Sequence, residues 1–141
     1  MKRVTAGLLM KDGLCLIAKR RAGDSLANFW EFPGGKIEVG ETPEECLQRE
    51  MFEELEINVE IGEFFCESIY EYEFGVIQLL VYWVSWQGDS LYPTVHDELA
   101  WVDQQSILTY RFLPADIPIV EKLTSLETTG LWGEKAYTKG E

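Results

Sequence analysis

The chain has 141 residues, 46% hydrophobic and 26% charged, a composition that predicts one soluble globular domain over residues 1–141. A formal net charge of −13 excludes an extended surface for DNA or RNA, and no apolar run reaches the roughly 20 residues that cross a membrane. We therefore expect a cytoplasmic monomer or homodimer without a nucleic-acid polymer or a membrane as partner.

The first part of the chain predicts a β-hairpin and then a short strand. Two β-prone runs, Val4–Met10 and Leu14–Lys19, flank Asp12-Gly13, and Asp-Gly between such runs is a strong turn signal. Residues 22–29 have the composition of a loop. Trp30–Phe32 is predicted to be a short strand that ends at the Pro-Gly-Gly sequence after it.

The clearest helix follows. Thr42 can cap its N-terminus, Pro43 suits the first turn, and Glu45 stands three residues after Thr42, as a capping box requires. We expect this helix to run to about Leu55.

The second half predicts two long strands, one short strand and a helix, at Val59–Tyr72, Val76–Trp86, Ala100–Val102 and Ala115 to about Leu126. A turn at Phe74-Gly75 would join the long strands, and residues 87–99 form a polar segment. The tail from Thr128 is predicted to be loose. Because strands outnumber helices, we expect an α+β fold, an α/β/α sandwich with a mixed sheet between helices.

Three acidic residues share one face of the predicted helix. At about 100° per residue, Glu53 and Glu54 lie within about 60° of Glu50, beside an apolar stripe of Leu47, Met51 and Leu55. A solvated acidic face and a metal site both fit this pattern. The single histidine, His96, and three cysteines without metal-ligand spacing exclude a multi-histidine or thiolate centre. A metal would therefore be held by oxygen, which points to Mg²⁺ or Mn²⁺.

These carboxylates belong to a longer pattern. Five residues separate Gly35 from Glu41, and seven more precede Arg49-Glu50-Met51-Phe52-Glu53-Glu54-Leu55-Glu56-Ile57. This spacing, over residues 35–57, resembles the signature of the Nudix hydrolase family at every defining position but one. The exception is Glu56, where the family has a glycine in left-handed conformation at the helix end. Because that conformation would cost a glutamate about 1 kcal/mol, we expect the helix end to shift, with Asn58 helping to close it.

The resemblance extends to the flanking residues. Residues 20–38, with Glu31-Phe32-Pro33-Gly34-Gly35-Lys36, and residues 113–118, Leu-Pro-Ala-Asp-Ile-Pro, are similar to MutT-type nucleoside triphosphate pyrophosphohydrolases. It implies the Nudix fold and a metal held by the carboxylates of Glu50, Glu53, Glu54 and Glu98 and by a backbone carbonyl of Gly34 or Gly35. Glu98 would be a distal ligand from a loop.

The resemblance also implies roles in catalysis and in structure. The general base for the attacking water would be Glu53, Glu54 or Glu98. Glu41 and Arg49 would form a structural pair that orients the metal ligands.

The same resemblance assigns the substrate contacts. Arg21 and Lys36 would hold phosphate oxygens, Phe32 is a candidate to stack on the base, and Asp116 would contact the base edge. While ionised, Asp116 only accepts hydrogen bonds, so it would select amino or ring N–H donors. Tyr72 and Tyr82 are further stacking candidates.

The expected reaction is Mg²⁺-dependent hydrolysis of a nucleoside triphosphate to a nucleoside monophosphate and pyrophosphate, which sanitises the nucleotide pool and serves DNA repair. The leading substrates are CTP-like or damaged pyrimidine nucleotides and 8-oxo-dGTP. Two alternatives remain open: a Nudix hydrolase of another substrate, ADP-ribose or a capped RNA end, and a Nudix sensor that binds a nucleotide without cutting it.

Overall fold

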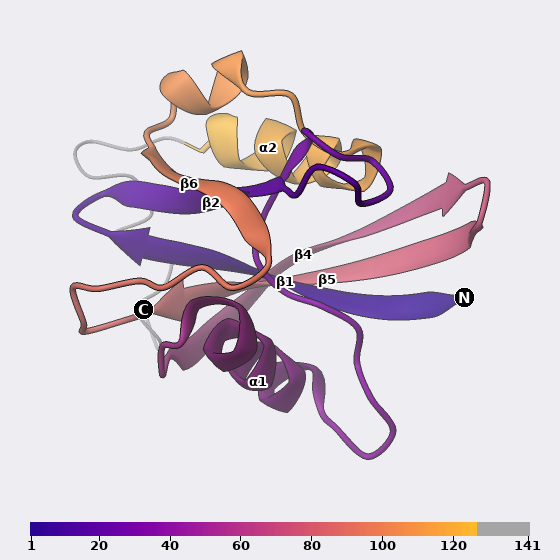
Figure 1. Ribbon diagram of the computed structural model, residues 1–141, viewed down its shortest axis with the longest axis horizontal. Coiled ribbons are helices and arrows are strands. Elements are labelled where there is room, and N and C mark those ends of the chain that lie inside the picture. The colour runs from indigo at the N-terminus through magenta and orange to yellow at the C-terminus, as the bar shows by residue number, and fades with distance from the viewer. Residues whose placement is uncertain (127–141) are drawn as a thin grey trace.

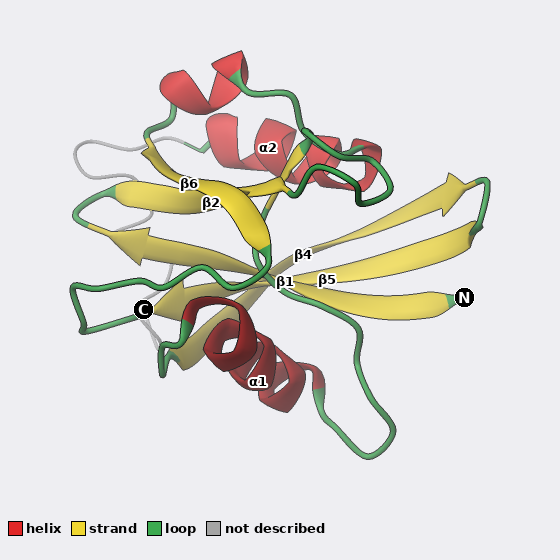
Figure 2. Cartoon of the chain, viewed as in Figure 1, coloured by secondary structure: helices red, strands yellow, loops and turns green. Residues whose placement is uncertain are grey.

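Residues 1–126, the part of the chain that this computed structural model describes, fold around a six-stranded mixed sheet (Figures 1 and 2). The strands are, in chain order, β1 (Lys2–Lys11), β2 (Leu14–Arg20), β3 (Trp30–Glu31), β4 (Glu60–Tyr72), β5 (Gly75–Ser85) and β6 (His96–Val102). They lie in the order β3-β2-β1-β5-β4, and β6 pairs with β2. The helices α1 (Pro43–Leu55) and α2 (Ile117–Thr124) cover opposite faces of the sheet (Figure 1). The predicted α+β sandwich is confirmed, while the predicted loose tail from Thr128 lies outside the described residues.

The central strand β1 carries a core on both of its faces. It pairs in parallel with β5 from Lys2↔Ile77 to Met10↔Ser85, and residues 5–10 are all buried. Such a continuous buried run is typical of a strand that is covered on both sides. One core lies toward α2 and includes Leu8, Ile17, Trp83, Ile119 and Leu123. The other lies toward α1 and includes Leu9, Leu16, Leu47, Met51 and Leu55.

The two hairpins form close to their predicted positions. The β1–β2 turn has both Asp12 (φ 54°) and Gly13 (φ 78°) in positive-φ conformations, as expected of a two-residue hairpin turn. The β4–β5 turn centres on Glu73 and Phe74, one residue earlier than predicted, because Gly75 already begins β5.

Two later elements differ from the prediction. Strand β6 begins at His96, four residues before the predicted start, because backbone pairing with β2 extends through residues that lack an apolar pattern. The last helix is shorter than predicted: Pro114–Asp116 forms a 3₁₀ turn, and α2 then ends at Thr124. Another 3₁₀ turn, Ser106–Thr109, was not predicted. No helix among residues 1–126 is both long enough and apolar enough to cross a bilayer.

Helix α1 begins as predicted but ends differently. Thr42 and Glu45 form the full capping box: Glu45 N–H donates to Thr42 Oγ1 (3.1 Å), and Thr42 N–H donates to Glu45 Oε1 (2.9 Å). The expectation of a shifted C-terminus is wrong. Glu56 adopts the left-handed conformation itself (φ 59°, ψ 40°), and its N–H donates to Phe52 O (2.9 Å), so Asn58 is not needed to close the helix. Glu56 is therefore strained, and the helix end keeps the left-handed geometry that a glycine would adopt without strain.

Candidate active site

The loop between β3 and α1 is held against the centre of the sheet by backbone hydrogen bonds. Thr5 N–H donates to Gly35 O and Gly7 N–H donates to Pro33 O, each at 2.8 Å. A Cβ atom at Gly34 would collide with the Thr5 carbonyl, so only glycine permits this close approach. The loop predicted to supply a carbonyl ligand is thus fixed to the most buried strand.

Arg49 joins this loop to the carboxylates of α1. Its guanidinium donates two hydrogen bonds to Glu41, from Nε to Oε2 (2.6 Å) and from Nη2 to Oε1 (3.0 Å). It also donates to Glu50 Oε2 (3.0 Å), to Glu53 Oε1 (3.2 Å) and to the carbonyl of Lys36 (3.1 Å). The hydrogen bond from Arg49 lowers the pKa of Glu41 to about 2, so this carboxylate stays ionised. The expected Arg49–Glu41 contact is therefore present, and Arg49 additionally donates a hydrogen bond to each of two helix glutamates.

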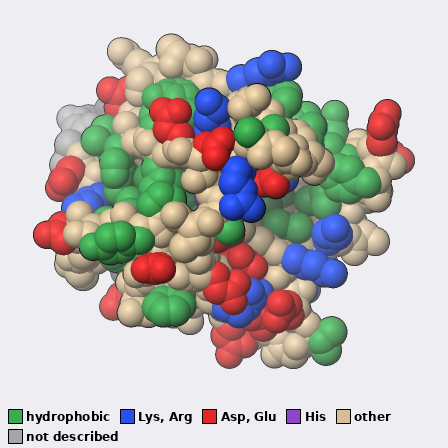
Figure 3. All heavy atoms as spheres, viewed as in Figure 1, with side chains coloured by type: hydrophobic (Ala, Val, Ile, Leu, Met, Phe, Trp, Pro, Cys, Tyr) green, Lys and Arg blue, Asp and Glu red, His purple; other side chains and the backbone are tan. Residues whose placement is uncertain are grey.

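The three helix carboxylates have different surroundings. The Glu53 side chain is 56% exposed, whereas those of Glu50 and Glu54 are 15% and 10% exposed. Figure 3 shows acidic and basic side chains gathered over α1 and the loop before it. Within residues 1–126, no three His, Cys, Asp or Glu side chains already converge on one metal-binding point. Arg49 accounts for part of this, because it holds Glu50 and Glu53.

The residues nevertheless fit a divalent cation. Glu54 Oε1 is buried and has no hydrogen-bond partner within the described chain. A Cβ at Gly35 would lie 2.5 Å from Glu50 Oε2, so glycine keeps the space beside that carboxylate open. Carboxylate and carbonyl oxygens are the donors that Mg²⁺ and Mn²⁺ prefer.

Glu31, Glu50 and Glu54 lie close together and form what we call the acidic cluster. Burial raises the pKa of Glu54 well above its ordinary value, and a hydrogen bond with Glu50 and the negative charges of Glu50 and Glu31 raise it further; the Gly34 N–H acts in the opposite direction. His96 Nε2 lies 2.8 Å from Glu31 Oε2, and His96 Nδ1 lies 4.0 Å from Glu54 Oε1. The acidic cluster thus includes one imidazole, which the sequence did not lead us to expect.

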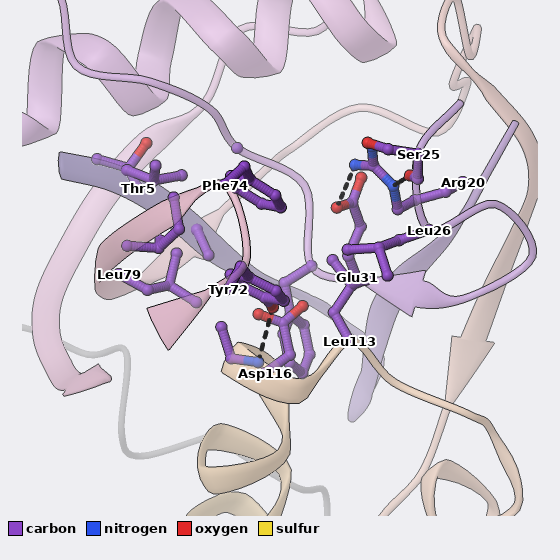
Figure 4. A pocket seen from close by; sticks show the side chains of 16 residues that line it. Thr5, Arg20, Ser25, Leu26, Glu31, Tyr72, Phe74, Leu79, Leu113 and Asp116 are labelled. Atoms are coloured by element: carbon purple, nitrogen blue, oxygen red, sulfur yellow. Dashed lines mark hydrogen bonds and ion pairs between the residues drawn. The ribbon is translucent and has the colours of Figure 1, made fainter. Parts of the chain in front are cut away.

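A largely apolar cavity of about 170 Å³ lies beside this cluster. Figure 4 shows Arg20 and Glu31, joined by a 3.1 Å hydrogen bond, on one side of it, and Tyr72 and Phe74 on the other, with Asp116 below. Tyr72 and Phe74 have parallel rings with centroids 5.0 Å apart, and Phe74 is 62% exposed. Asp116 is only 4% exposed; this burial, followed by the charge of Glu31, raises the pKa of its carboxyl well above the ordinary value.

A second, more polar cavity of about 250 Å³ adjoins the first. Its lining includes Glu54 and His96, and the two cavities share Val4, Arg20, Glu31 and Gly34. A ligand with an aromatic end and a polyanionic end could therefore occupy both cavities at once.

The structure brings most of the predicted site residues together. Phe32 and Asp116 line the apolar cavity, Gly35 and Glu54 line the polar one, and Gly34 lines both. Phe32 is 4% exposed and stacks on Phe112. Tyr82, named as a stacking candidate, is buried in the core toward α1 instead.

Three predicted residues lie elsewhere. Arg21 and Lys36 are exposed and, like Glu50 and Glu53, line neither cavity; unlike those two glutamates, they are not on α1. Glu98 lies in strand β6 and not in a loop; its side chain is 59% exposed and Oε1 lies 4.0 Å from Lys19 Nζ. The pairing of β6 with β2 turns Glu98 away from the carboxylates of α1.

Sequence reasoning missed Arg20, Glu31, Phe74 and His96 as site residues. Strand β2 extends one residue beyond its predicted end, to Arg20. Because side chains alternate along a strand, Arg20 points to the face of the sheet opposite to that of Lys19. Glu31 was a usable signal, because it is a charged residue between two large aromatic residues, Trp30 and Phe32, in a predicted strand. Nothing in the sequence placed His96, because its position depends on the register of β6.

Comparisons with known proteins identify the family of the chain. The NUDIX domain family matches residues 1–123. The chain is 35% identical over 126 residues to the CTP pyrophosphohydrolase of Escherichia coli, covering 89% of this chain and 93% of the relative. It is 32% identical over 123 residues to the 8-oxo-dGTP diphosphatase of Haemophilus influenzae, covering 86% and 90%.

Solved structures show the same fold. The solution structure of the E. coli ORF135 protein matches with a TM-score of 0.77 and 36% identity, over 86% of each chain. The MutT protein from Methanosarcina mazei matches with a TM-score of 0.79 at 23% identity, over 86% of this chain and 91% of that one, a likeness of fold. The predicted Nudix fold is confirmed. With a family match over 123 of its 141 residues and the glutamates of the signature in place beside the loop, the chain belongs to the Nudix family and is a MutT-like hydrolase of phosphoanhydride bonds.

Proposed function

We propose that this protein hydrolyses a nucleoside triphosphate to a nucleoside monophosphate and pyrophosphate, and so removes unwanted nucleotides from the pool. The observation that carries the proposal is the junction of the two cavities at Gly34, Glu31 and Arg20. A base bound between Phe74 and Asp116 would direct its phosphates toward the carboxylates of α1. The names of the two relatives, a CTP pyrophosphohydrolase and an 8-oxo-dGTP diphosphatase, support a triphosphate substrate.

Nudix hydrolases generally use divalent metal ions, and for this chain we propose Mg²⁺, or Mn²⁺ in its place. Glu50, Glu53 and Glu54 would hold the metal. Gly35 O already accepts hydrogen bonds from Thr5 N (2.8 Å) and Thr5 Oγ1 (3.2 Å), so Gly34 is the better candidate for the carbonyl ligand. When bound, the metal neutralises phosphate charge and makes water a stronger nucleophile at neutral pH. We assign the proton acceptor for that water to Glu53 or Glu54, since both lie on α1 beside Glu50, whereas Glu98 lies in β6 near Lys19.

Basic side chains would bind the phosphates. Arg20 lines both cavities, and we assign to it the phosphate contact that was expected of Arg21. Because Arg20 Nη1 already pairs with Glu31 (3.1 Å), its charge is anchored at the junction. Arg21 and Lys36, both exposed, remain candidates for phosphate oxygens that project beyond the cavities.

Asp116 would read the base. A carboxyl group with a raised pKa keeps its proton to higher pH, and it then offers one donor and one acceptor side by side. The Watson–Crick edge of cytosine presents the complementary pair, N3 as acceptor and N4–H as donor, and the O6 and N1–H of a guanine edge do so as well. We therefore keep CTP-like or damaged pyrimidine nucleotides and 8-oxo-dGTP as the leading substrates.

The test is a substrate panel with Mg²⁺ that includes CTP, dCTP, 5-substituted dCTP, dGTP, 8-oxo-dGTP and ADP-ribose. Products are resolved by chromatography, and pyrophosphate and orthophosphate are assayed separately. We expect equimolar monophosphate and pyrophosphate from one of the triphosphates. Release of orthophosphate, or cleavage of ADP-ribose alone, would contradict the proposal and favour another Nudix substrate. Tight nucleotide binding without turnover would favour the sensor.

A further inference from the structure

His96 is turned into the acidic cluster by an irregularity in strand pairing. Lys19 of β2 pairs with Glu98, but Arg20 pairs with His96, so Asp97 is an extra residue in β6. Such bulges change the direction of a side chain. The His96 side chain is only 3% exposed, whereas Asp97 and Glu98 are exposed.

The two ring nitrogens of His96 have different surroundings. Nε2 lies 2.8 Å from Glu31 Oε2, which is a good hydrogen bond. Nδ1 is buried and has no hydrogen-bond partner in the described chain, and the same is true of Glu54 Oε1. These two atoms face each other at 4.0 Å, which is too long for a hydrogen bond. Buried polar atoms without partners destabilise a fold, so such a pair calls for a ligand between them.

The chemistry of the two atoms identifies this ligand as a cation. Because Glu31 is its acceptor, Nε2 carries the hydrogen, and in this tautomer Nδ1 presents a lone pair toward Glu54. A lone pair and a carboxylate oxygen are both electron-pair donors. Metal–ligand bonds of about 2.0–2.2 Å separate two donors of one ion by about 3 to 4 Å, depending on the angle between them. The Glu31–His96 pair also has the form of the carboxylate–histidine arrangement that orients metal-binding imidazoles.

We propose that His96 Nδ1 and Glu54 Oε1 bind one divalent metal ion together, which makes this a mixed nitrogen and oxygen site. This inference rests on the proposed function and adds to it a residue from outside the family signature. An imidazole ligand shifts the preference of a site from Mg²⁺ toward transition-series ions such as Mn²⁺, Co²⁺ or Zn²⁺. The cavity of about 250 Å³ that both residues line has room for further ligands, water or phosphate oxygens.

The sequence makes the proposal unusually easy to test, because His96 is the only histidine among 141 residues. Mn²⁺ is added to the full chain after removal of any histidine tag, and pulsed electron paramagnetic resonance then looks for coupling of the metal to an imidazole nitrogen. A signal of this kind can come only from His96. We expect it in the unaltered protein, and a Mn²⁺-loaded protein that lacks it overturns the proposal without any variant.

Two variants measure the contribution of the ring. His96→Gln can keep the hydrogen bond to Glu31 while it removes Nδ1, and we expect a loss of the nitrogen signal and Mn²⁺ binding that is about 10-fold weaker or more. Glu63→Gln, an exposed glutamate of strand β4, is the control and should keep both the signal and the affinity. Unchanged Mn²⁺ affinity in His96→Gln, with native circular dichroism, overturns the proposal.

The failures of the two proposals are distinguishable. Pyrophosphate release with Mg²⁺ but no imidazole coupling to Mn²⁺ overturns only the His96 ligand. Imidazole coupling without hydrolysis of any triphosphate supports the site and contradicts the proposed function.

Discussion

Arg49→Lys should destabilise the protein, although the positive charge is retained. Arg49 makes five hydrogen bonds to oxygen atoms, two of them to the carboxylate of Glu41, and its side chain is 24% exposed. A lysine ammonium is a single point of charge and cannot span Glu41 and Glu50 as a guanidinium does. If about two charged hydrogen bonds are lost, each worth about 1 kcal/mol after allowance for partial exposure, unfolding becomes easier by about 2 kcal/mol. For a chain of this size, that corresponds to a melting temperature lower by about 6 °C.

The assay is urea unfolding followed by tryptophan fluorescence, with thermal unfolding as a second measurement. Arg3→Lys is the control, because Arg3 is exposed, and its unfolding free energy should stay within about 0.5 kcal/mol of the unaltered protein. A change below about 0.5 kcal/mol in Arg49→Lys would refute the argument that the geometry of the guanidinium, and not its charge, joins the loop to the helix.

Three further predictions concern single residues. Glu56→Gly should raise the free energy of unfolding by about 1 kcal/mol, because glycine adopts the left-handed helix end without strain; destabilisation in urea would contradict this. Glu53→Gln should lower kcat about 100-fold or more, while kcat of Glu98→Gln should stay within about twofold of the unaltered enzyme. Equal losses of kcat in steady-state assays would show that Glu98 also takes part in catalysis. Asp116→Asn should raise the melting temperature increasingly as pH rises. The folded state holds a proton on Asp116 that the unfolded chain releases above about pH 4, so the buried carboxyl lowers stability only above that pH. A gain that shrinks between pH 4 and pH 8 would show that the sign of this argument is wrong.

Local signals in the sequence were sufficient for most elements of the fold. The Asp-Gly turn, the capping box at Thr42 and the apolar run of β1 each depend on neighbouring residues, and the structure confirms all three. The start of β6 at His96 was missed because its first residues are polar and their pairing with β2 leaves no apolar pattern in the sequence. The end of α1 was missed for the opposite reason, since the penalty at Glu56 was foreseen but its tolerance depends on the contacts of the whole loop.

The site was predictable where spacing along one helix determines it. Glu50, Glu53 and Glu54 follow from the signature, as does the contact between Arg49 and Glu41. Even so, helix periodicity placed the three glutamates on one face and could not reveal that Glu54 is buried while Glu53 is exposed. Residues that reach the site across the sheet depend on register, and a single extra residue in β6 exchanges His96 for Glu98.

Glu31 links the two halves of the proposed site. One of its carboxylate oxygens lies 3.1 Å from Arg20 Nη1, which lines the apolar cavity. The other lies 2.8 Å from His96 Nε2, which lines the polar cavity. Its negative charge also raises the pKa of both Asp116 and Glu54. Since β3 has only two residues and is paired to β2 at Ala18 and Lys19, the position of this carboxylate is fixed by the sheet. Protonation of Asp116 and protonation of Glu54 should therefore be coupled through the charge of Glu31. This coupling does not require Asp116 to approach a phosphate.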